Sequence, residues 1–491
     1  MKSILAPVFD RAVPFVRSLI PVLSLTLAVS LVAPALFSPV IAQQCAGACF
    51  NPGCLDSSFG NCGLVLTDVS HASLTSDHDG AHALVMQSDS KLITAGTTNY
   101  NGSGVQFAAV RYNVDGTLDD TFGNIDPNTN QRTGVVITPF TYQGVSYNVL
   151  SAEAAALQRV STETGIEERL IQAGVLVGNS GGYDFAVVRY TPAGDLDVSF
   201  NGSGKQIISS GTSEGIYACT IQGDGKIILS GYTGVNWLLM RLNFDGSLDT
   251  SFGSGGKATV SFGNKVGNPI AWAVTMQQTL AGERILAAGR SYANKTDYDF
   301  ALARLNLNGT LDTSFGTSGK VVTDFFSNFD QARAVAIDQT TGDIVAAGSA
   351  TRNSRSPNDY ALARYTANGQ LVTGFGTSGK VMTDFVGDAD NCVGVAIQWD
   401  GKIVAAGHVK SSGGTYNFGI SRYNTSGVLD SAFGSGGKVI TDFGGYQDFG
   451  GGVVLQVVSG FQRIVVAGAA GITDTGNPNY GYNYALARYF E

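Results

Sequence analysis

The chain is poor in charged residues, histidine, methionine and tryptophan. Only 14% of its 491 residues are charged, and it contains four His, five Met and three Trp. With 44% hydrophobic residues it has ample apolar surface to bury, so intrinsic disorder is excluded. Acidic residues outnumber basic ones by 39 to 30. This balance argues against a nucleic-acid partner, because binding phosphates requires a basic surface.

Familiar catalytic motifs are also missing. The sequence has no G-x-S-x-G, H-E-x-x-H or Walker-type loop. Acidic turns such as Asn113 to Asp119 and Asn243 to Gly246 bring oxygen ligands close together, but the closing Glu of an EF-hand loop is absent. We therefore predict no catalytic residues and no cofactor, and calcium in these turns is the alternative.

The first 42 residues differ in composition from the rest. Three basic residues precede an apolar run over 19–37, and Val40 and Ala42 occupy the small-residue positions before a cleavage point at Gln43. This pattern predicts a Sec-type signal peptide over 1–42. An uncleaved membrane anchor is the alternative, but Pro21 and Pro34 interrupt the run. We expect a secreted, periplasmic or cell-surface protein, monomeric and without a membrane span after cleavage.

Most of the cysteines follow directly after this cleavage point. In an exported protein, such a cluster predicts two local disulfides, whose connectivity the spacing leaves open. A zinc cluster is the alternative, although paired C-x-x-C spacing is absent. Residues 43–54 form a Cys-rich segment, and the disulfide candidates are Cys45, Cys49, Cys54 and Cys62.

A repeat of about sixty residues fills the remaining chain. The hexamer L-D-x-S-F-G, or a close variant, opens seven repeats over 55–491, at Leu55, Leu118, Leu196, Leu248, Leu311, Leu371 and Leu429. A second marker, an arginine that closes an apolar run such as A-L-A-R-Y, also occurs seven times, at Arg111, Arg189, Arg241, Arg304, Arg364, Arg422 and Arg488. Internal repeats of this kind indicate a solenoid, propeller or array.

Each repeat predicts four short strands. In the fifth repeat, runs rich in Val, Ile and Ala cover 320–325, 333–337, 343–348 and 360–365. In other repeats, tight turns at Gly223-Asp224-Gly225 and Asp400-Gly401 predict a hairpin between the second and third runs. We expect the connection from Arg304 to Lys320 to cross from the outer edge of one sheet to the inner strand of the next. We also expect the first hexamer to pack beside the last repeat and close a ring. The predicted fold is all-β, a single seven-bladed β-propeller with four antiparallel strands per blade.

Three motifs that recur in fixed order carry a resemblance to a known family. L-D-T-S-F-G-T-S-G-K-V-V-T-D-F over 311–325, D-G-K over 400–402 and Y-A-L-A-R-Y over 360–365 resemble the delta-60 repeat family of bacterial exported proteins. The resemblance covers essentially all of 55–491. It implies a propeller-like repeat fold and brings no catalytic residues with it.

The residues that repeat most regularly are predicted to be structural. The repeated Asp is expected to accept backbone N–H bonds in a turn, and the repeated Arg is expected to pair with such Asp carboxylates between blades. The repeated phenylalanines are expected to fill the space between neighbouring sheets, and they are Phe59, Phe122, Phe200, Phe252, Phe315, Phe375 and Phe433.

Two further groups are candidates for binding. His71, His78, Asp79 and His82 gather in the first repeat and are weak metal candidates, with an exposed polar loop as the alternative. The variable loops between the third and fourth runs carry tyrosines suited to an adaptable binding surface, at Tyr100, Tyr292, Tyr416, Tyr480 and Tyr482.

These features favour a secreted, non-catalytic scaffold that binds a protein or a glycan. A metal-dependent hydrolase or lactonase with its site in the central channel is the first alternative, because propellers support many functions. A calcium-stabilised adhesion module is the second.

Overall fold

The computed structural model describes residues 49–70, 79–99, 104–142, 145–163, 165–177, 182–209, 214–263, 267–292, 297–353, 357–411, 413–444, 446–472 and 481–491. All of them belong to one compact unit of the chain. The predicted signal peptide lies outside the described residues, as do Cys45, His71, His78, Tyr100 and Tyr480. Within the described ranges, no helix is long and apolar enough to cross a membrane.

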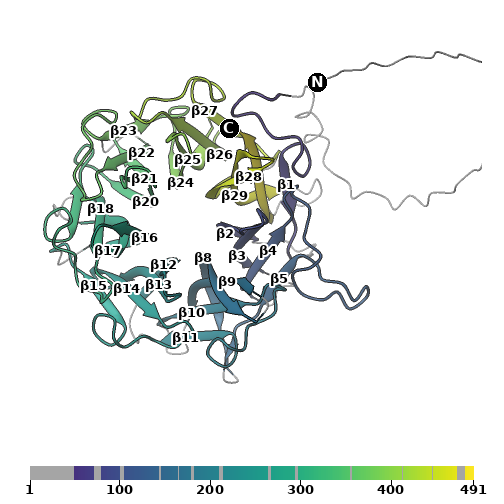
Figure 1. Cartoon of the computed structure of the whole chain (residues 1–491). Coiled ribbons are helices and arrows are strands. Elements are labelled where there is room, and N and C mark those ends of the chain that lie inside the picture. Colours follow the sequence, from purple (N-terminus) through teal and green to yellow (C-terminus); the bar gives the residue numbers. More distant parts are fainter. Residues whose placement is uncertain are drawn as a thin grey trace, which may run out of the picture. The chain divides into compact units, whose positions relative to one another are not determined.

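Seven four-stranded antiparallel sheets stand around a central channel, which confirms the predicted seven-bladed propeller (Figure 1). Blade 1 contains β2 (Gly80–Met86), β3 (Leu92–Thr98), β4 (Gln106–Tyr112) and β5 (Val135–Thr138). Blade 2 contains β8 (Asn148–Thr162), β9 (Gly165–Val177), β10 (Tyr183–Tyr190) and β11 (Lys205–Ser209). Blade 3 contains β12 (Glu214–Ile221), β13 (Ile227–Thr233), β14 (Asn236–Leu242) and β15 (Lys257–Val260).

The other four blades repeat this plan. Blade 4 contains β16 (Ile270–Thr279), β17 (Gly282–Ser291), β18 (Asp299–Leu305) and β19 (Lys320–Thr323). Blade 5 contains β20 (Asp330–Ile337), β21 (Ile344–Thr351), β22 (Asn358–Tyr365) and β23 (Lys380–Thr383). Blade 6 contains β24 (Asp390–Ile397), β25 (Ile403–Lys410), β26 (Tyr416–Tyr423) and β27 (Lys438–Thr441). Blade 7 combines β28 (Asp448–Val458), β29 (Phe461–Ile472) and β30 (Gly481–Phe490) with β1 (Leu64–Thr67). A separate two-stranded ladder consists of β6 (Thr141–Tyr142) and β7 (Val145–Ser146).

The first strand of each blade lies nearest the channel, and the chain then proceeds outward (Figure 1). The prediction that the connection from Arg304 to Lys320 passes between blades is wrong. β19 pairs with β18 of the same sheet, because the marker hexamer turns the chain back and Leu305 bridges Leu311. The step to the next blade is made by the shorter segment 324–329, between β19 and β20.

The chain closes the ring with its own N-terminal strand. β1 pairs antiparallel with β30, and Leu64 lies opposite Ala487. The backbone N–H of Asp56 donates to the carbonyl of Arg488 at 2.8 Å. The first hexamer therefore packs beside the last repeat, as expected, and leaves β30 without an open edge.

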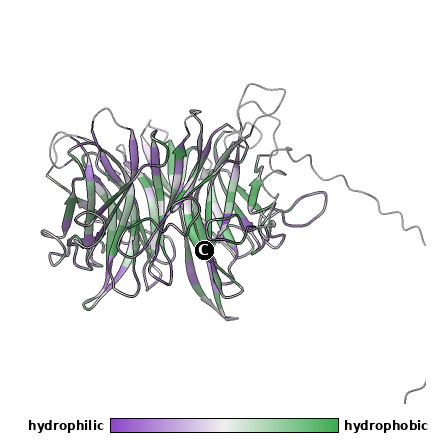
Figure 2. Cartoon of the chain, turned by 90° about the horizontal axis from the view of Figure 1, so that it is seen from above, coloured by the Kyte–Doolittle hydropathy of each residue, from purple (hydrophilic) through white to green (hydrophobic). Residues whose placement is uncertain are grey.

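The core consists of the layers between neighbouring blades. Every residue of β18 is buried, because both faces of this strand pack against other sheets. Figure 2 shows hydrophobic segments running along the strands. Phe315 is fully buried in a cluster with Leu302 of blade 4 and Ala361 of blade 5, so it fills the space between two blades. The other six marker phenylalanines are 0–1% exposed.

The marker arginine of blade 4 connects this blade to the next. Arg304 is 2% exposed, and its Nε donates to Asp312 Oδ2 at 2.9 Å. Its guanidinium lies 4.8 Å from the centroid of the Phe315 ring. Its Nη1 donates to the carbonyl of Ala367, in the following blade, at 2.7 Å. The prediction that these Arg–Asp pairs bridge blades is wrong, because Arg and Asp flank one turn and the contact across blades goes to a carbonyl instead.

The same pairing recurs around the ring. Equivalent ion pairs are Arg111–Asp119, Arg189–Asp197, Arg241–Asp249, Arg422–Asp430 and Arg488–Asp56. One repeat has Val372 in place of the aspartate. There Arg364 pairs with Asp338 at 3.0 Å and with Asp343 at 2.9 Å, so other carboxylates replace the missing one.

Candidate ligand site at the channel mouth

A β-bulge in the first strand of each blade places one side chain at the channel. In blade 5 the register of β20 shifts between Ala332 and Ala334, and the intervening Arg333 lines a cavity. A bulge leaves its extra residue outside the ladder and redirects its side chain. The cavity-lining residues at these bulges are His82, Glu153, Tyr217, Trp272, Arg333, Val393 and Gly451.

These seven positions are equivalent in the repeat, yet each carries a different residue. Their neighbours along the strand are small or aliphatic, as in Ala271 and Ala273 around Trp272. The neighbours pack between blades and are constrained by volume, whereas the bulge residue faces open space. The ring of bulge residues therefore combines a cation, an acid, an imidazole and two aromatic rings in one place.

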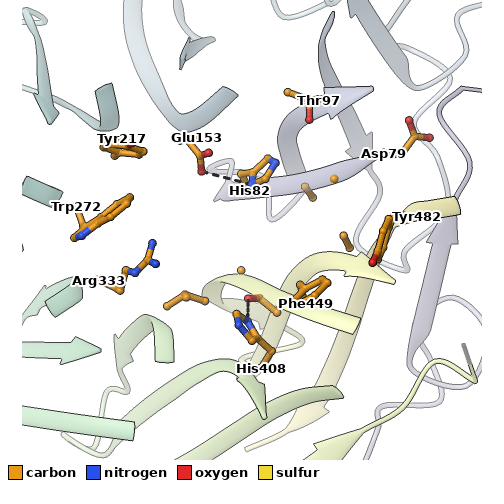
Figure 3. A pocket seen from close by; sticks show the side chains of 16 residues that line it. Asp79, His82, Thr97, Glu153, Tyr217, Trp272, Arg333, His408, Phe449 and Tyr482 are labelled. Atoms are coloured by element: carbon orange, nitrogen blue, oxygen red, sulfur yellow. Dashed lines mark hydrogen bonds and ion pairs between the residues drawn. The ribbon is translucent and has the colours of Figure 1, made fainter. Parts of the chain in front are cut away.

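The cavity has a volume of about 490 Å³, within the usual range of ligand pockets (Figure 3). Besides the bulge residues, Asp79, Thr97, His408, Phe449 and Tyr482 line it. Gly80 begins β2, and Thr97 lies near the end of β3. The cavity is thus on the face of the propeller where the variable loops emerge. These loops connect the second and third strands of each blade, which correspond to the third and fourth predicted runs.

One wall is a row of three side chains, in which Trp272 lies between Tyr217 and Arg333 and the two rings are tilted by 51° (Figure 3). The Tyr217 and Trp272 ring centroids are 4.2 Å apart, and the guanidinium carbon of Arg333 is 4.0 Å from the Trp272 ring. Among the described carboxylates, none lies within 4.0 Å of the Arg333 nitrogens. Burial lowers the pKa of Arg333 from its usual value, and Arg290 lowers it further. Arg333 therefore brings a positive charge to the cavity without an ion-pair partner in the described chain.

A second wall carries hydrogen-bonding groups. His82 Nδ1 lies 3.5 Å from Glu153 Oε2. Asp79 Oδ2 accepts the backbone N–H groups of Val69 at 2.9 Å and Ser70 at 3.0 Å. Asp79 thus holds the segment that leads into blade 1.

The opposite wall is aromatic. His408 packs edge-on against Phe449, with centroids 5.2 Å apart, and Phe449 contacts Tyr482 at 6.0 Å. His408 Nδ1 lies 3.3 Å from the carbonyl oxygen of Gly450. Burial lowers the pKa of His408 to about 4, so this imidazole is neutral at neutral pH and adds no charge to the wall.

The predicted binding tyrosines divide between the cavity and the loops. Tyr482 lines the cavity. The ring centroid of Tyr416 lies 5.4 Å from that of Phe449, which is also a cavity residue. Tyr292 contacts Tyr298 at 5.1 Å. The remaining two lie outside the described residues.

The described metal candidates and the cysteines are placed as follows. Asp79 and His82 both line the cavity, where His82 faces Glu153. Cys49 is disulfide-bonded to Cys54, and Cys62 is also in a disulfide.

Sequence reasoning missed most of the cavity. Arg333 is predicted only as the start of a strand, and Glu153 and Trp272 are not among the candidate residues, because each lies inside a run rich in small and aliphatic residues. An alignment of the seven repeats carries a signal that finds them, since one position between two small residues changes its chemistry from blade to blade.

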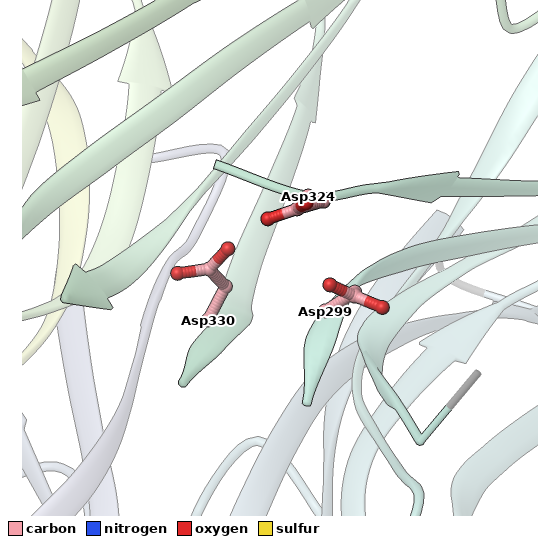
Figure 4. Close-up of side chains that lie close together, drawn as sticks. All are labelled: Asp299, Asp324 and Asp330. Atoms are coloured by element: carbon pink, nitrogen blue, oxygen red, sulfur yellow. The ribbon is translucent and has the colours of Figure 1, made fainter. Parts of the chain in front are cut away.

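Two clusters of aspartates lie between blades on the same face. In one, ligand oxygens of Asp299, Asp324 and Asp330 lie within 4.8 Å of one another (Figure 4). Asp359, Asp384 and Asp390 repeat this arrangement in the next blade.

The central carboxylate of the first cluster is buried. Asp330 is 0% exposed, and its Oδ2 accepts the backbone N–H of Phe325 at 2.7 Å, while its Oδ1 has no hydrogen-bond partner among the described residues. Burial, with help from the neighbouring carboxylates, raises the pKa of Asp330 to about 8 and that of Asp299 to about 7. The cluster therefore holds protons, or a cation, at neutral pH.

Comparisons with known proteins agree with the fold. Six segments, 87–122, 169–200, 222–252, 284–315, 339–375 and 398–433, match the family described as "Domain of unknown function (DUF5122) beta-propeller". Six segments of the chain are thus similar to the repeats of a β-propeller family of unknown function. No curated protein matches the chain.

Three similar solved structures have low sequence identity to this chain. A PL25 ulvan lyase is 11% identical with a TM-score of 0.41, covering 89% of this chain and 94% of its own. Drosophila Plexin A, solved in complex with Semaphorin 1b, is 7% identical with a TM-score of 0.42, covering 89% of this chain and 88% of its own. The Bacillus subtilis arabinanase Arb43A is 12% identical with a TM-score of 0.30, covering 55% of this chain and 92% of its own.

Proposed function

We propose that this protein is an exported, monomeric, non-catalytic binding scaffold that takes part of a glycan or protein ligand into the mouth of its channel. The single observation that carries this proposal is the ring of seven different bulge residues around one cavity. A scaffold that builds seven near-identical blades and varies one inward position provides a rigid site with adjustable chemistry. The recurring motifs also support assigning the repeats to the delta-60 family.

A binding role fits the polar groups better than hydrolysis does. Of the cavity residues that could act as acid, base or metal ligand, Asp79 already accepts two backbone N–H groups, and His408 lies beside a backbone carbonyl. Only His82 and Glu153 approach each other. The described groups of three close carboxylates lie between blades and not in the channel.

A channel-filling substitution tests this proposal. Val393→Trp places a large ring in the cavity. The substitution removes no side chain that takes part in a described ion pair. We expect oligosaccharides that bind the wild type on an array of neutral and acidic glycans to lose binding in this variant, measured by calorimetry. Val428→Trp is the matched control, because Val428 is 60% exposed and follows β26 on the opposite face.

Each outcome of this experiment is informative. Loss of binding in Val393→Trp, with unchanged melting and unchanged binding in Val428→Trp, supports the channel mouth. Equal binding by all three proteins would show that the glycan binds outside the channel mouth. An array on which the wild type binds no glycan would contradict glycan binding.

A second candidate is stabilisation of the ring by a cation, and the two aspartate clusters between blades favour it. Asp330 and Asp390 are both 0% exposed, and each has one carboxylate oxygen without a hydrogen-bond partner. Carboxylate oxygens are the ligands that Ca²⁺ prefers. Metal analysis of the purified protein, with melting in the presence and absence of EDTA, tests this role. Metal-free protein with an unchanged melting temperature would contradict it.

A further inference from the structure

We propose that the channel mouth binds the oxyanion group, carboxylate or sulfate, of an acidic saccharide, and that Arg333 is the residue that binds it. This inference rests on the proposed function and names the ligand class for the same cavity.

The first argument concerns charge. The protein is acidic overall, with 39 acidic and 30 basic residues, and its marker arginines all have carboxylate partners, as Arg304 has Asp312. Arg333 is different, because it lines the cavity and has no described carboxylate within ion-pair distance. Glu153 in the same cavity raises the pKa of Arg333 electrostatically but lies beyond ion-pair distance. A partly buried guanidinium without a directly paired carboxylate is costly. A bound anion removes this cost.

The second argument concerns geometry. The Trp272 ring lies against the face of the Arg333 guanidinium at 4.0 Å, and Tyr217 supports Trp272 from its other side (Figure 3). A guanidinium stacked in this way has its face occupied, so its N–H groups are left to point outward along the edge. Two parallel N–H donors match the two oxygens of a carboxylate or sulfate.

The third argument favours a saccharide as the carrier of this anion. A sugar ring has apolar faces and a rim of hydroxyls. Across the cavity, Phe449 and Tyr482 offer aromatic surface. The His82–Glu153 pair and Thr97 offer donors and acceptors for hydroxyl groups. An acidic peptide would also satisfy Arg333, but it would cover Phe449 and Tyr482 only if it carried an apolar side chain, whereas one sugar ring brings an apolar face and hydroxyls together.

The test compares charged and neutral sugars of the same shape. Glucuronate and glucose, and their oligomers, are titrated into the protein by calorimetry, with the intrinsic fluorescence of Trp272 as a second signal. We expect glucuronate oligomers to bind at least ten-fold more tightly than glucose oligomers, and added salt to reduce this preference. Trp272→Phe is expected to remove the fluorescence response, whereas Trp399→Phe, at a residue 66% exposed, retains it.

Arg333→Gln is the decisive variant. We expect it to lower the affinity for glucuronate oligomers at least ten-fold, equivalent to about 1.4 kcal/mol, and to abolish the preference over glucose. Arg159→Gln is the matched control, since it removes the same charge from a side chain that is 70% exposed and outside the cavity. Arg333→Lys is expected to recover only part of the preference, because it restores the charge without the stacked fork.

Different failures have different meanings. Equal binding of charged and neutral sugars in both wild type and Arg333→Gln would overturn this inference, and sensitivity to Val393→Trp would leave the proposed function standing. Binding of poly-glutamate but not of glucuronate oligomers would overturn the saccharide assignment. Absence of binding by any of these probes would overturn the inference together with glycan binding.

Discussion

The ion pairs between the marker arginines and the aspartates of the hexamer turns allow a quantitative test of what stabilises the ring. In Asp312→Ala, the carboxylate that pairs with Arg304 at 2.9 Å and with Arg284 at 3.1 Å is lost. Arg304 is 2% exposed, so its charge stays buried. Removing one partner of a buried pair costs about 3–5 kcal/mol. In this variant Arg304 still donates to Gln277 and to the carbonyl of Ala367. We therefore expect the free energy of unfolding to fall by about 3 kcal/mol, the lower end of this range.

The natural variation at blade 5 supplies a matched comparison. Asp343→Ala also removes a carboxylate from a marker arginine, but Arg364 keeps Asp338 at 3.0 Å. We expect a smaller loss of unfolding free energy, about 1.5–2 kcal/mol, at the lower end of the range for one hydrogen bond to a charged group, because the Asp343 side chain is 19% exposed. Urea unfolding followed by circular dichroism measures both, with an unchanged m-value showing that the folded ring is intact. Equal losses in the two variants, or a loss below about 1 kcal/mol in Asp312→Ala, would refute this account of the pairing.

Two further predictions concern the aspartate clusters and the ring closure. The raised pKa of Asp330, about 8, and of Asp390, about 7, means that the folded protein retains protons which the unfolded chain releases near pH 4. Their contribution to stability is therefore complete below about pH 4 and is lost as the pH rises through 7 to 8. The double variant Asp330→Asn, Asp390→Asn should melt higher than wild type at pH 8 and equally below about pH 4, where the wild-type carboxyls are protonated in both the folded and the unfolded chain. A wild type that is the more stable at pH 8 in EDTA would contradict this. Deletion of residues 49–67 removes β1 and exposes the edge of β30, so we expect a lower melting temperature and concentration-dependent association by light scattering, whereas a stable monomer would show that β1 is not needed for closure.

The fold was predictable because its markers are local and repeat seven times. The hexamer, the closing arginine and the Asp-Gly hairpins each fix a turn or a strand end, and counting them gives the number of blades. The path between blades was not predictable from spacing alone. Two readings of the segment between Arg304 and Lys320 are compatible with its length, and the bridge between Leu305 and Leu311, which folds it back, is a backbone contact that leaves little trace in sequence.

The candidate site was largely hidden for a related reason. Its side chains come from seven strands and meet only when the ring closes. A single bulge residue in an apolar strand, such as Arg333 or Trp272, has the appearance of an exception to the strand pattern. Tyr482 was predictable because the composition of a tyrosine-rich variable loop indicates a binding surface. His82 was predictable because three of the four histidines gather in the first repeat. Glu153, which faces His82 from the next blade, carries no such signal.

The most direct test of the channel-mouth site is a crystal structure of the protein soaked with the oligosaccharide that binds most tightly on the array. We predict electron density for a sugar in the cavity, with an oxyanion group beside the Arg333 guanidinium and a ring facing Phe449 and Tyr482. Density only on the outer strands or on the hairpin face, or an empty channel at a concentration that saturates binding in solution, would contradict the account.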